Sequence, residues 1–220
     1  MPALDEAEGI GAVLAALAPL RARGHEVIVV DGGSRDDTSR VAAPLADRVL
    51  VTPRGRARQQ NAGAAVARGD VLLFLHADTV LPDGADRLVL QALARPGRAW
   101  GRFDIRIEGR APVLRLVAAL MNLRSRWSGI ATGDQAIFVR RSTFEAVGGF
   151  PAIELMEDVA LSARLRRVAP PACLRERVVT SGRRWEARGP LRTIGLMWSL
   201  RLRYALGESP ASLRRRYEGA

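Results

Sequence analysis

Acidic residues stand at three places along the chain where a carboxylate could bind a ligand or a metal ion, or take up a proton. Asp31 and Asp78 each come at the end of a short apolar run, and Glu157-Asp158 open a predicted helix. A carboxylate just past a strand can accept a hydrogen bond from a nucleobase or ribose. It can also hold a divalent cation that bridges phosphates, because hard cations prefer oxygen ligands. A carboxylate can also take a proton from a hydroxyl group, which is a poor nucleophile until that proton leaves.

Each of these acids also has an ordinary structural interpretation. Asp31 suits an Asx turn, Asp78 suits a turn or a helix cap, and acids at 157–158 are favourable at a helix N-terminus. Two acids at adjacent strand ends are more informative than either one alone. Both interpretations stay open at the level of the sequence.

A basic segment, residues 53–63, leads into a predicted helix and contains Arg56. Arginine suits bidentate contact with phosphate, and a helix N-terminus adds backbone donors; a solvated basic stretch is the alternative. The segment lacks the Gly-x-Gly-x-x-Gly arrangement, and Asp31-Gly32-Gly33 places an acid where a dinucleotide-binding fold needs glycine first. The sequence therefore disfavours a Rossmann dehydrogenase.

Apolar runs alternate with amphipathic segments over the first 95 residues. This alternation, with short connections, predicts an α/β fold with a doubly wound, mainly parallel sheet flanked by helices. The second half is less regular, and we expect it to extend the sheet and to build one side of a cleft. The predicted strands are 26–30, 48–51, 71–75, 99–107 and 135–139, and the predicted helices are 5–22, 57–67, 83–94, 112–127, 157–167 and 190–206.

Length and composition bound the class of protein. A chain of 220 residues with 48% hydrophobic residues is long enough for one domain with a substantial core. No apolar run reaches the roughly 18–20 residues that a membrane-spanning helix needs. The first residues turn acidic at once, so no secretory signal peptide is predicted. We therefore expect a cytoplasmic protein.

The net charge is +11, and Arg supplies all of the formal positive charge. Such a surface favours anionic partners, namely phosphates, acidic lipids or nucleic acid. Aromatic residues make up only 5% and no zinc-finger pattern is present, which disfavours nucleic acid. Residues 190–206 mix large apolar side chains with arginines, so this helix is expected either to lie on an anionic membrane or to pack on the domain with its arginines outward.

Five short segments stand in a characteristic order along the chain. They are Pro2-Ala3-Leu4-Asp5-Glu6, Val30-Asp31-Gly32-Gly33-Ser34, Phe74-Leu75-His76-Ala77-Asp78, Gly133-Asp134-Gln135 and Glu157-Asp158. From Met1 to about Tyr217 the chain resembles family 2 glycosyltransferases, and most of all a bacterial branch known as radical-SAM/selenodomain-associated transferases. The resemblance implies a GT-A fold and transfer of a sugar from a nucleotide diphosphate sugar to an acceptor hydroxyl, by an inverting, metal-dependent reaction.

The resemblance also implies roles on the donor side. Pro2, Ala3 and Asp31 would line the nucleobase pocket, with Asp31 facing the base. Arg56 matches a basic position near the donor. Asp78 matches the last acid of the family's Asp-X-Asp motif and would bind Mg²⁺ or Mn²⁺ on the diphosphate.

On the acceptor side, the resemblance makes Asp158 the general base, with Glu157 beside it. Gly133-Asp134 would border the acceptor and the transferred sugar. Arg184-Trp185 resembles an Arg-Trp pair that lies near the diphosphate or acceptor in related enzymes, whereas packing in the core is the plain alternative for Trp185.

The chain departs from the family pattern at three places. His76 replaces the first acid of Asp-X-Asp, where imidazole would contact the metal or a ribose hydroxyl with one negative charge fewer. Asp5 stands where the family usually has Asn. The family's apolar first strand precedes Pro2-Ala3 and is reduced here to Met1, so we expect either an upstream start or a truncated first strand.

With this resemblance, we expect one GT-A domain over 1–220. Its nucleotide-binding half would be 1–95, its acceptor half 96–189, and a C-terminal amphipathic helix and tail would occupy 190–220. The acceptor would be lipid-linked if 190–206 lies on the inner membrane face. Two alternatives stay open: a degenerate transferase that binds a nucleotide or an anionic lipid without catalysis, and a nucleotidyltransferase, for which the glycine-rich basic signature near the first strand is missing.

Overall fold

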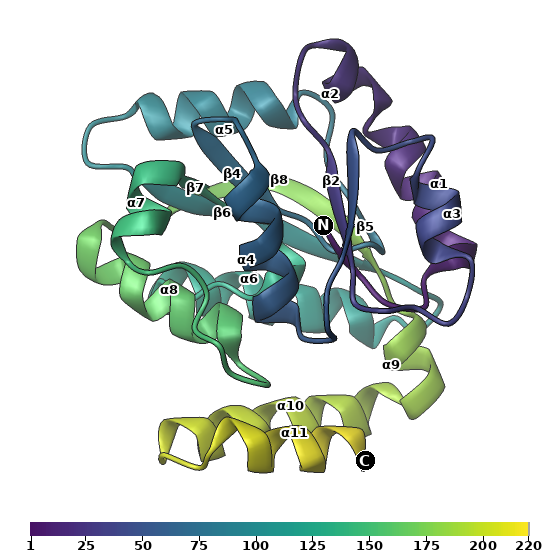
Figure 1. Cartoon of the computed structure of the whole chain (residues 1–220). Helices are drawn as coiled ribbons and strands as arrows, with labels where there is room; N and C mark the ends of the chain where they lie inside the picture. The colour runs from purple at the N-terminus through teal and green to yellow at the C-terminus, as the bar shows by residue number, and fades with distance from the viewer. Residues whose placement is uncertain (220) are drawn as a thin grey trace.

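The computed structural model describes residues 1–219, apart from the side chains at positions 184, 187, 188 and 191. Two hydrogen-bonded sheets run through the molecule and helices surround them (Figure 1). The first sheet has the order β1-β2-β3 and is parallel throughout, which confirms the α/β class with a parallel sheet and flanking helices. Its strands are β1 (Pro2–Ala3), β2 (Ile28–Asp31) and β3 (Arg48–Val51), with helices α1 (Ala7–Ala16), α2 (Ala18–Ala22), α3 (Thr38–Ala42) and α4 (Arg56–Val66) along the same part of the chain.

The second sheet has the order β4-β7-β6-β8-β5 and is mixed. Strands β6 and β8 are parallel, whereas β4-β7, β6-β7 and β5-β8 are antiparallel. We expected the run 71–75 to continue the parallel sheet, but β4 pairs with β7. An apolar run indicates that a strand is buried and does not indicate its partner. The strands are β4 (Val71–Phe74), β5 (Thr79–Val80), β6 (Trp100–Glu108), β7 (Ile137–Arg140) and β8 (Ala172–Ser181).

The helices that lie between β5 and β8 along the chain pack on this mixed sheet and position the loops at its edge. Phe74 in β4 packs against Phe144 and Phe150, with ring centroids 5.1 Å and 4.8 Å away. The Asn61 amide on α4 donates to Phe150 O at 2.8 Å and accepts from Phe150 N at 3.0 Å. The chain entering α8 is thus fixed to both β4 and α4. The helices are α5 (Ala85–Ala94), α6 (Val113–Ser128), α7 (Arg141–Ala146) and α8 (Glu157–Val168), and η1 (Gly133–Gln135) is a 3₁₀ turn.

Three helices follow β8: α9 (Arg183–Arg188), α10 (Pro190–Ala205) and α11 (Pro210–Glu218). The last two lie together below the rest of the molecule in the view of Figure 1. Leu200 of α10 and Leu213 of α11 are buried in one cluster with Met156, the residue before α8. Met156 has φ 69°, in the left-handed region. No helix in the described part of the chain is long and apolar enough to cross a membrane.

A buried amide holds β1, β2 and α4 together. Gln59 on α4 is 3% exposed, and its Nε2 donates to Ala3 O and Val30 O, each at 2.8 Å. These carbonyls belong to the two strands whose ends carry Ala3 and Asp31. The same helix begins at Arg56, so this contact sets where the start of α4 lies relative to the strand ends.

Replacement of Gln59 by Ala removes both hydrogen bonds and leaves two carbonyls without these donors. We expect the free energy of unfolding to fall by about 1–3 kcal/mol, because an unsatisfied buried polar group costs about that much. Urea unfolding followed by circular dichroism measures the change. Arg58→Ala, at an exposed position on the same helix, is the matched control and should change stability by less than about 0.5 kcal/mol. Equal losses in the two variants would contradict the role given to Gln59.

Candidate functional site

Four segments that are distant in sequence meet at one edge of the structure. They are the loop after β4 with His76 and Asp78, the turn η1 with Asp134, the start of α8, and the start of α4 with Arg56. Electrostatic interactions link Arg56 and His76 to Asp134 and Asp158. Most of the site residues expected from the sequence in the central part of the chain are therefore brought together.

The start of α8 is bonded directly to η1. The Gly133 N–H donates to Asp158 Oδ2 at 2.7 Å, and Asp158 Oδ1 accepts from Val159 N, also at 2.7 Å. Thr132 and Gln135 form a capping box around the turn, so the direction of the Gly133 N–H is fixed by local structure. Each Asp158 oxygen accepts one hydrogen bond here, and a carboxylate can accept more than that.

His76 packs against the same glycine. A Cβ atom on Gly133 would lie 2.4 Å from His76 Nε2, so no other residue fits at position 133 while the ring stays in place. Burial and the charge of Arg56 lower the pKa of His76, and the carboxylates of Asp134, Asp78 and Asp158 oppose them. The imidazole is therefore neutral near pH 7.

Glu157 is 4% exposed, and burial raises its pKa to about 7, with the charge of Asp158 acting in the same direction. Arg56 opposes this rise. Arg56 itself keeps an exposed surface although protein encloses its other sides. Desolvation alone would lower the Arg56 pKa, but nearby acids, Glu157 first, raise it. The cluster therefore retains a permanent cation beside one carboxyl group that titrates near neutrality.

Asp31 lies at the end of β2, paired in register with Ala3 of β1. It is 4% exposed and accepts from Ser34 N at 2.8 Å, Ser34 Oγ at 2.6 Å and Ser39 Oγ. Burial alone would raise its pKa, but these hydrogen bonds outweigh burial and lower it. The structure shows the Asx-turn interpretation of Asp31. Pro2 pairs with Val30 beside it, so the three residues expected at the nucleobase occupy neighbouring strand positions.

Asp78 is partly buried, and its Oδ1 accepts from Thr79 Oγ1 at 3.3 Å. Within residues 1–219 no group of three His, Cys, Asp or Glu side chains is arranged to hold a metal ion by itself. Mg²⁺ commonly binds through one or two carboxylates together with phosphate oxygens of a substrate. The donor set at Asp78 fits that mode, and it does not fit a closed protein cage.

The remaining acceptor residues differ in what the structure shows. Trp185 is partly buried and packs against the main hydrophobic cluster, which agrees with the plain packing interpretation. The side chain of Arg184 lies outside the described residues.

Sequence reasoning missed Arg124, in the middle of α6. Its Nε and Nη2 are buried without a hydrogen-bond partner among the described residues, and Nη1 donates to Ile130 O at 3.4 Å. Burial, followed by the charge of Arg201, lowers its pKa to about 10, and Asp158 and Asp134 act against that shift. The signal in the sequence was a charged residue within an apolar helical pattern.

Comparison with known proteins gives a consistent result. Residues 1–151 match the model of the family described as "Glycosyl transferase family 2". An uncharacterized glycosyltransferase of Mycobacterium tuberculosis is 36% identical over 85 residues, which are 38% of this chain and 37% of that protein. This chain spans less than two thirds of the length of the curated relatives that it matches.

Two solved structures share the fold. The mannosyltransferase PcManGT of Pyrobaculum calidifontis, in complex with GDP-Man and Mn²⁺, has a TM-score of 0.58 at 21% identity, over 81% of this chain and 54% of that one. Residues 1–349 of S. aureus TarS, in complex with UDP, have a TM-score of 0.65 at 15% identity, over 82% of this chain and 58% of that one.

The raised pKa of Glu157 predicts a pH dependence of stability. The folded protein holds a proton on Glu157 up to about pH 7, whereas the unfolded chain loses it near pH 4.5, so the stabilisation is complete below about 4.5 and is lost as the pH rises through 7. Glu157→Gln cannot ionise. Its free energy of unfolding relative to the wild type should increase across this window, by up to about 3 kcal/mol.

Urea unfolding at a series of pH values measures this difference. Glu154→Gln, at an exposed position just before α8, is the control and should follow the wild type at every pH. A difference between Glu157→Gln and the wild type that stays constant from pH 4.5 to 8 would refute the buried, proton-holding state.

Proposed function

This chain belongs to glycosyl transferase family 2, and on that premise we propose that it moves a sugar from a nucleotide diphosphate sugar to an acceptor hydroxyl with inversion at the anomeric carbon. The observation that supports the proposal best is the 2.7 Å hydrogen bond from Gly133 N to Asp158 Oδ2. It joins the candidate base to the turn that packs on His76, and so to the loop that carries Asp78.

The donor nucleotide would bind across the ends of β1, β2 and β4. Pro2, Ala3 and Asp31 lie at the first two strand ends and would contact the nucleobase, with Asp31 using oxygen lone pairs beyond its serine contacts. Arg56 would contact the diphosphate, since its charge is retained and part of its surface is open. His76 would contact the metal or a ribose hydroxyl. The structures of PcManGT with GDP-Man and of TarS with UDP, which share the fold, support a nucleotide site at this edge.

Asp158 would act as the general base in a single displacement. As the acceptor oxygen forms its bond to the anomeric carbon, the hydroxyl proton passes to an Asp158 oxygen. The bond from that carbon to the phosphate oxygen breaks, and the nucleoside diphosphate leaves with the electron pair. Gly133-Asp134 and Arg184-Trp185 would border the sugar and the acceptor. The Gly133 N–H would hold the carboxylate in position throughout.

Asp78 would hold Mg²⁺ or Mn²⁺ on the diphosphate, which would supply positive charge against the leaving group. Arg56 would add a second, fixed positive charge on the protein side. Stabilisation of developing charge is often the largest single contribution to catalysis. Neutral His76 next to Asp78 leaves that loop with one formal negative charge, so phosphate oxygens would complete the cation's ligands.

Several finer assignments belong to this proposal. The donor half would be residues 1–95 and the acceptor half 96–189, with the C-terminal helices at 190–220. The acceptor would be lipid-linked, and the chain would work at the cytoplasmic face of the inner membrane. The radical-SAM/selenodomain-associated branch is proposed from the sequence segments alone.

Asp158→Asn separates catalysis from binding. The amide oxygen of Asn can still accept from Gly133 N, so the loops should stay in place while the base is lost. We expect turnover to fall by about 10²–10⁴-fold, with donor affinity within a few-fold of the wild type. Release of nucleoside diphosphate measures turnover, and calorimetric titration with UDP- and GDP-sugars measures affinity. Loss of donor binding together with turnover would contradict a dedicated base.

Asp78→Asn should change the effect of the metal on nucleotide binding. Nucleotide binding by the wild type should strengthen when Mn²⁺ is added, and this gain should be lost in the variant because the carboxylate that holds the cation is gone. The same titrations, with and without Mn²⁺, measure it, and Asp158→Asn serves as the control that keeps the gain. Nucleotide binding without turnover in the wild type would favour the non-catalytic binding protein.

A further inference from the structure

Helix α6 carries an apolar stripe on its outer face. Leu116, Leu120, Leu123 and Trp127 are all exposed, and their spacing places them on one side of the helix. Trp127 at the end of the stripe is 91% exposed. The opposite side of α6 is buried through Leu114, Val117 and Ala118, so the helix is apolar on both faces. Packing against the rest of the domain accounts for the apolar residues on the inner face of α6 and not for those on its outer face.

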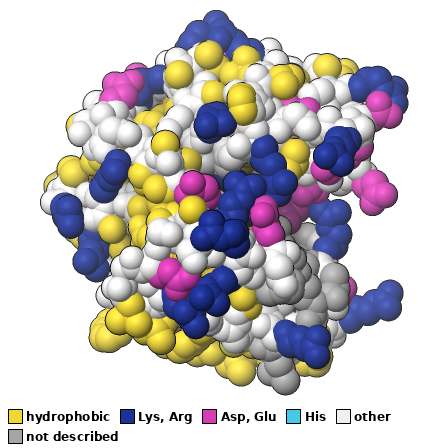
Figure 2. Space-filling view, turned by 60° about the horizontal axis from the view of Figure 1, so that its bottom comes forward, with side chains coloured by type: hydrophobic (Ala, Val, Ile, Leu, Met, Phe, Trp, Pro, Cys, Tyr) yellow, Lys and Arg dark blue, Asp and Glu magenta, His cyan; other side chains and the backbone are white. Residues whose placement is uncertain are grey.

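Helix α10 packs against α6 and has a stripe of the same kind. Trp198, Leu202 and the C-cap residue Leu206 are exposed, one turn apart. Most of the large exposed hydrophobic side chains among the described residues lie on these two helices. Figure 2 shows hydrophobic side chains gathered along the lower edge of the molecule, beside arginines. Exposed apolar side chains that gather in one place and are bordered by polar residues mark interaction sites.

The charge on the two helices has a single sign. Neither α6 nor α10 contains Asp or Glu, and each contains three arginines. Arg, Trp and Leu on amphipathic helices are typical of elements that lie in the interface of an anionic bilayer. Of these arginines, Arg115 and Arg126 on α6 and Arg192 and Arg203 on α10 are exposed. Arg124 and Arg201 are partly buried.

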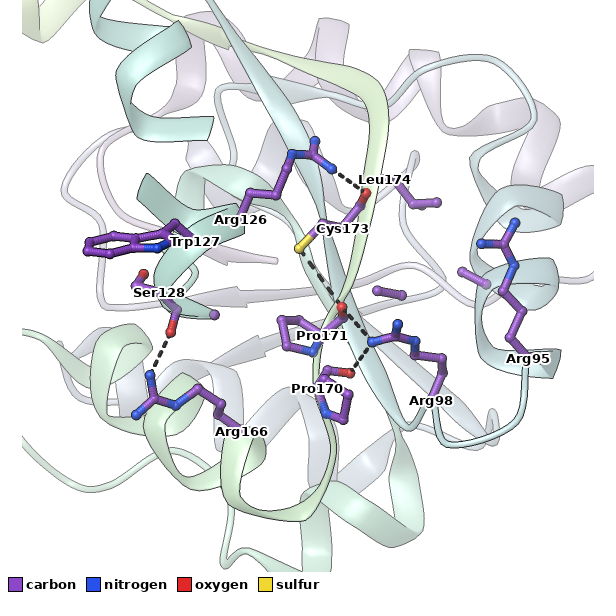
Figure 3. A pocket seen from close by; sticks show the side chains of 13 residues that line it. Arg95, Arg98, Arg126, Trp127, Ser128, Arg166, Pro170, Pro171, Cys173 and Leu174 are labelled. Atoms are coloured by element: carbon purple, nitrogen blue, oxygen red, sulfur yellow. Dashed lines mark hydrogen bonds between the residues drawn. The ribbon is translucent and has the colours of Figure 1, made fainter. Parts of the chain in front are cut away.

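A cavity of about 660 Å³ opens at the end of the α6 stripe, with Arg126 and Trp127 at its wall. Arg95, Arg98 and Arg166 line it as well, and no acidic side chain does among the described lining residues. Figure 3 shows Arg98, Arg126 and Arg166 around Pro171 and Cys173. The cavity therefore gathers positive charge from three separate elements.

The arginines of the cavity keep donors for a ligand. Arg98 Nη1 donates to Pro170 O and Pro171 O, each at 3.0 Å, and Arg166 Nη1 donates to Ser128 O at 2.6 Å. Arg126 has fewer donors left for a ligand, because its guanidinium forms an ion pair with Asp104 at 2.8 Å. A guanidinium carries five N–H donors, so these anchors orient Arg98 and Arg166 and leave several donors for phosphate oxygens.

We propose that the outer faces of α6 and α10 dock this protein on an anionic bilayer, and that the arginine cavity takes the phosphodiester headgroup of an acidic phospholipid. The leucines would enter the acyl boundary, Trp127 and Trp198 would lie at headgroup level, and the cavity would meet a headgroup beside Trp127. A second copy of the chain fits less well, because a two-fold contact would bring together two faces whose helices carry arginine and no acidic residue. The proposal rests on the proposed function only for the idea of a lipid-linked acceptor.

The test is sedimentation of the whole chain with vesicles at physiological salt. Vesicles of phosphatidylcholine with phosphatidylglycerol should bind the wild type, and pure phosphatidylcholine should bind it at least about tenfold more weakly. A variant with Leu123→Gln, Trp127→Gln, Trp198→Gln and Leu202→Gln should lose at least about tenfold in binding to the anionic vesicles. Leu90→Gln, at an equally exposed leucine on α5, is the control and should bind as the wild type does.

A second pair of variants tests the cavity. Arg95→Gln with Arg166→Gln should lower binding to anionic vesicles by about tenfold or more and leave binding to neutral vesicles unchanged. Arg35→Gln with Arg40→Gln removes the same charge near α3 and should have a much smaller effect. Equal effects of the two pairs would overturn the headgroup site. Circular dichroism and urea unfolding establish that each variant is folded.

The docking proposal would be overturned if the folded wild type did not bind anionic vesicles. A concentration-dependent dimer in sedimentation velocity would then assign this face to a contact with a second copy of the chain. Vesicle binding needs no turnover, so Asp158→Asn and Asp78→Asn should bind vesicles as the wild type does. A failure of the proposed reaction is therefore distinguishable from a failure of docking.

Discussion

The hydrogen bond from Gly133 to Asp158 is the contact on which the arrangement of the site depends. It requires a bare glycine, because a side chain at position 133 would collide with His76. It also requires the capped turn η1, which aims the N–H at the first turn of α8. One short contact thus fixes the loop after β4, the turn and the helix start relative to one another. The acids and Arg56 are held close enough to shift one another's proton affinity.

The sequence predicted the local elements well and their partners poorly. Apolar runs that end in an acidic residue located β2 and the loop after β4. The apolar residues indicated the buried strand, and the acid indicated the strand end. The antiparallel pairing of β4 with β7 was not predictable, because an apolar run does not indicate which strand it pairs with or in which direction. The serine contacts of Asp31 and the unsatisfied nitrogens of Arg124 depend on three-dimensional packing. The exposure of the outward leucines of α6 could not be predicted either, because a helix with apolar residues on more than one side is normally buried.

Exclusive use of arginine gives the molecule two kinds of positive charge. Some guanidinium groups are structural: Arg141 donates to Ala67 O and Gly69 O, each at 2.6 Å, and so joins α7 to the end of α4. Others, such as Arg56 and those of the cavity beside Trp127, retain donors or open surface. Because guanidinium does not deprotonate in proteins, this charge pattern is constant across the physiological pH range. Changes of charge near neutral pH come from other groups, such as the carboxyl group of Glu157.

The residue with left-handed backbone before α8, Met156, also packs against the C-terminal helices. A non-glycine residue in this conformation costs roughly 1–2 kcal/mol, and here the Met156 side chain is buried against Leu200 of α10 and Leu213 of α11. Packing of the terminal helices against Met156 thus stabilises this backbone conformation. The next two residues along the chain are Glu157 and Asp158. Leu155 and Val159, which stand on either side of these two carboxylate residues, pack against the same cluster. The C-terminal helices and the start of α8 therefore share one packed cluster, although α8 begins at Glu157 and α10 begins only at Pro190.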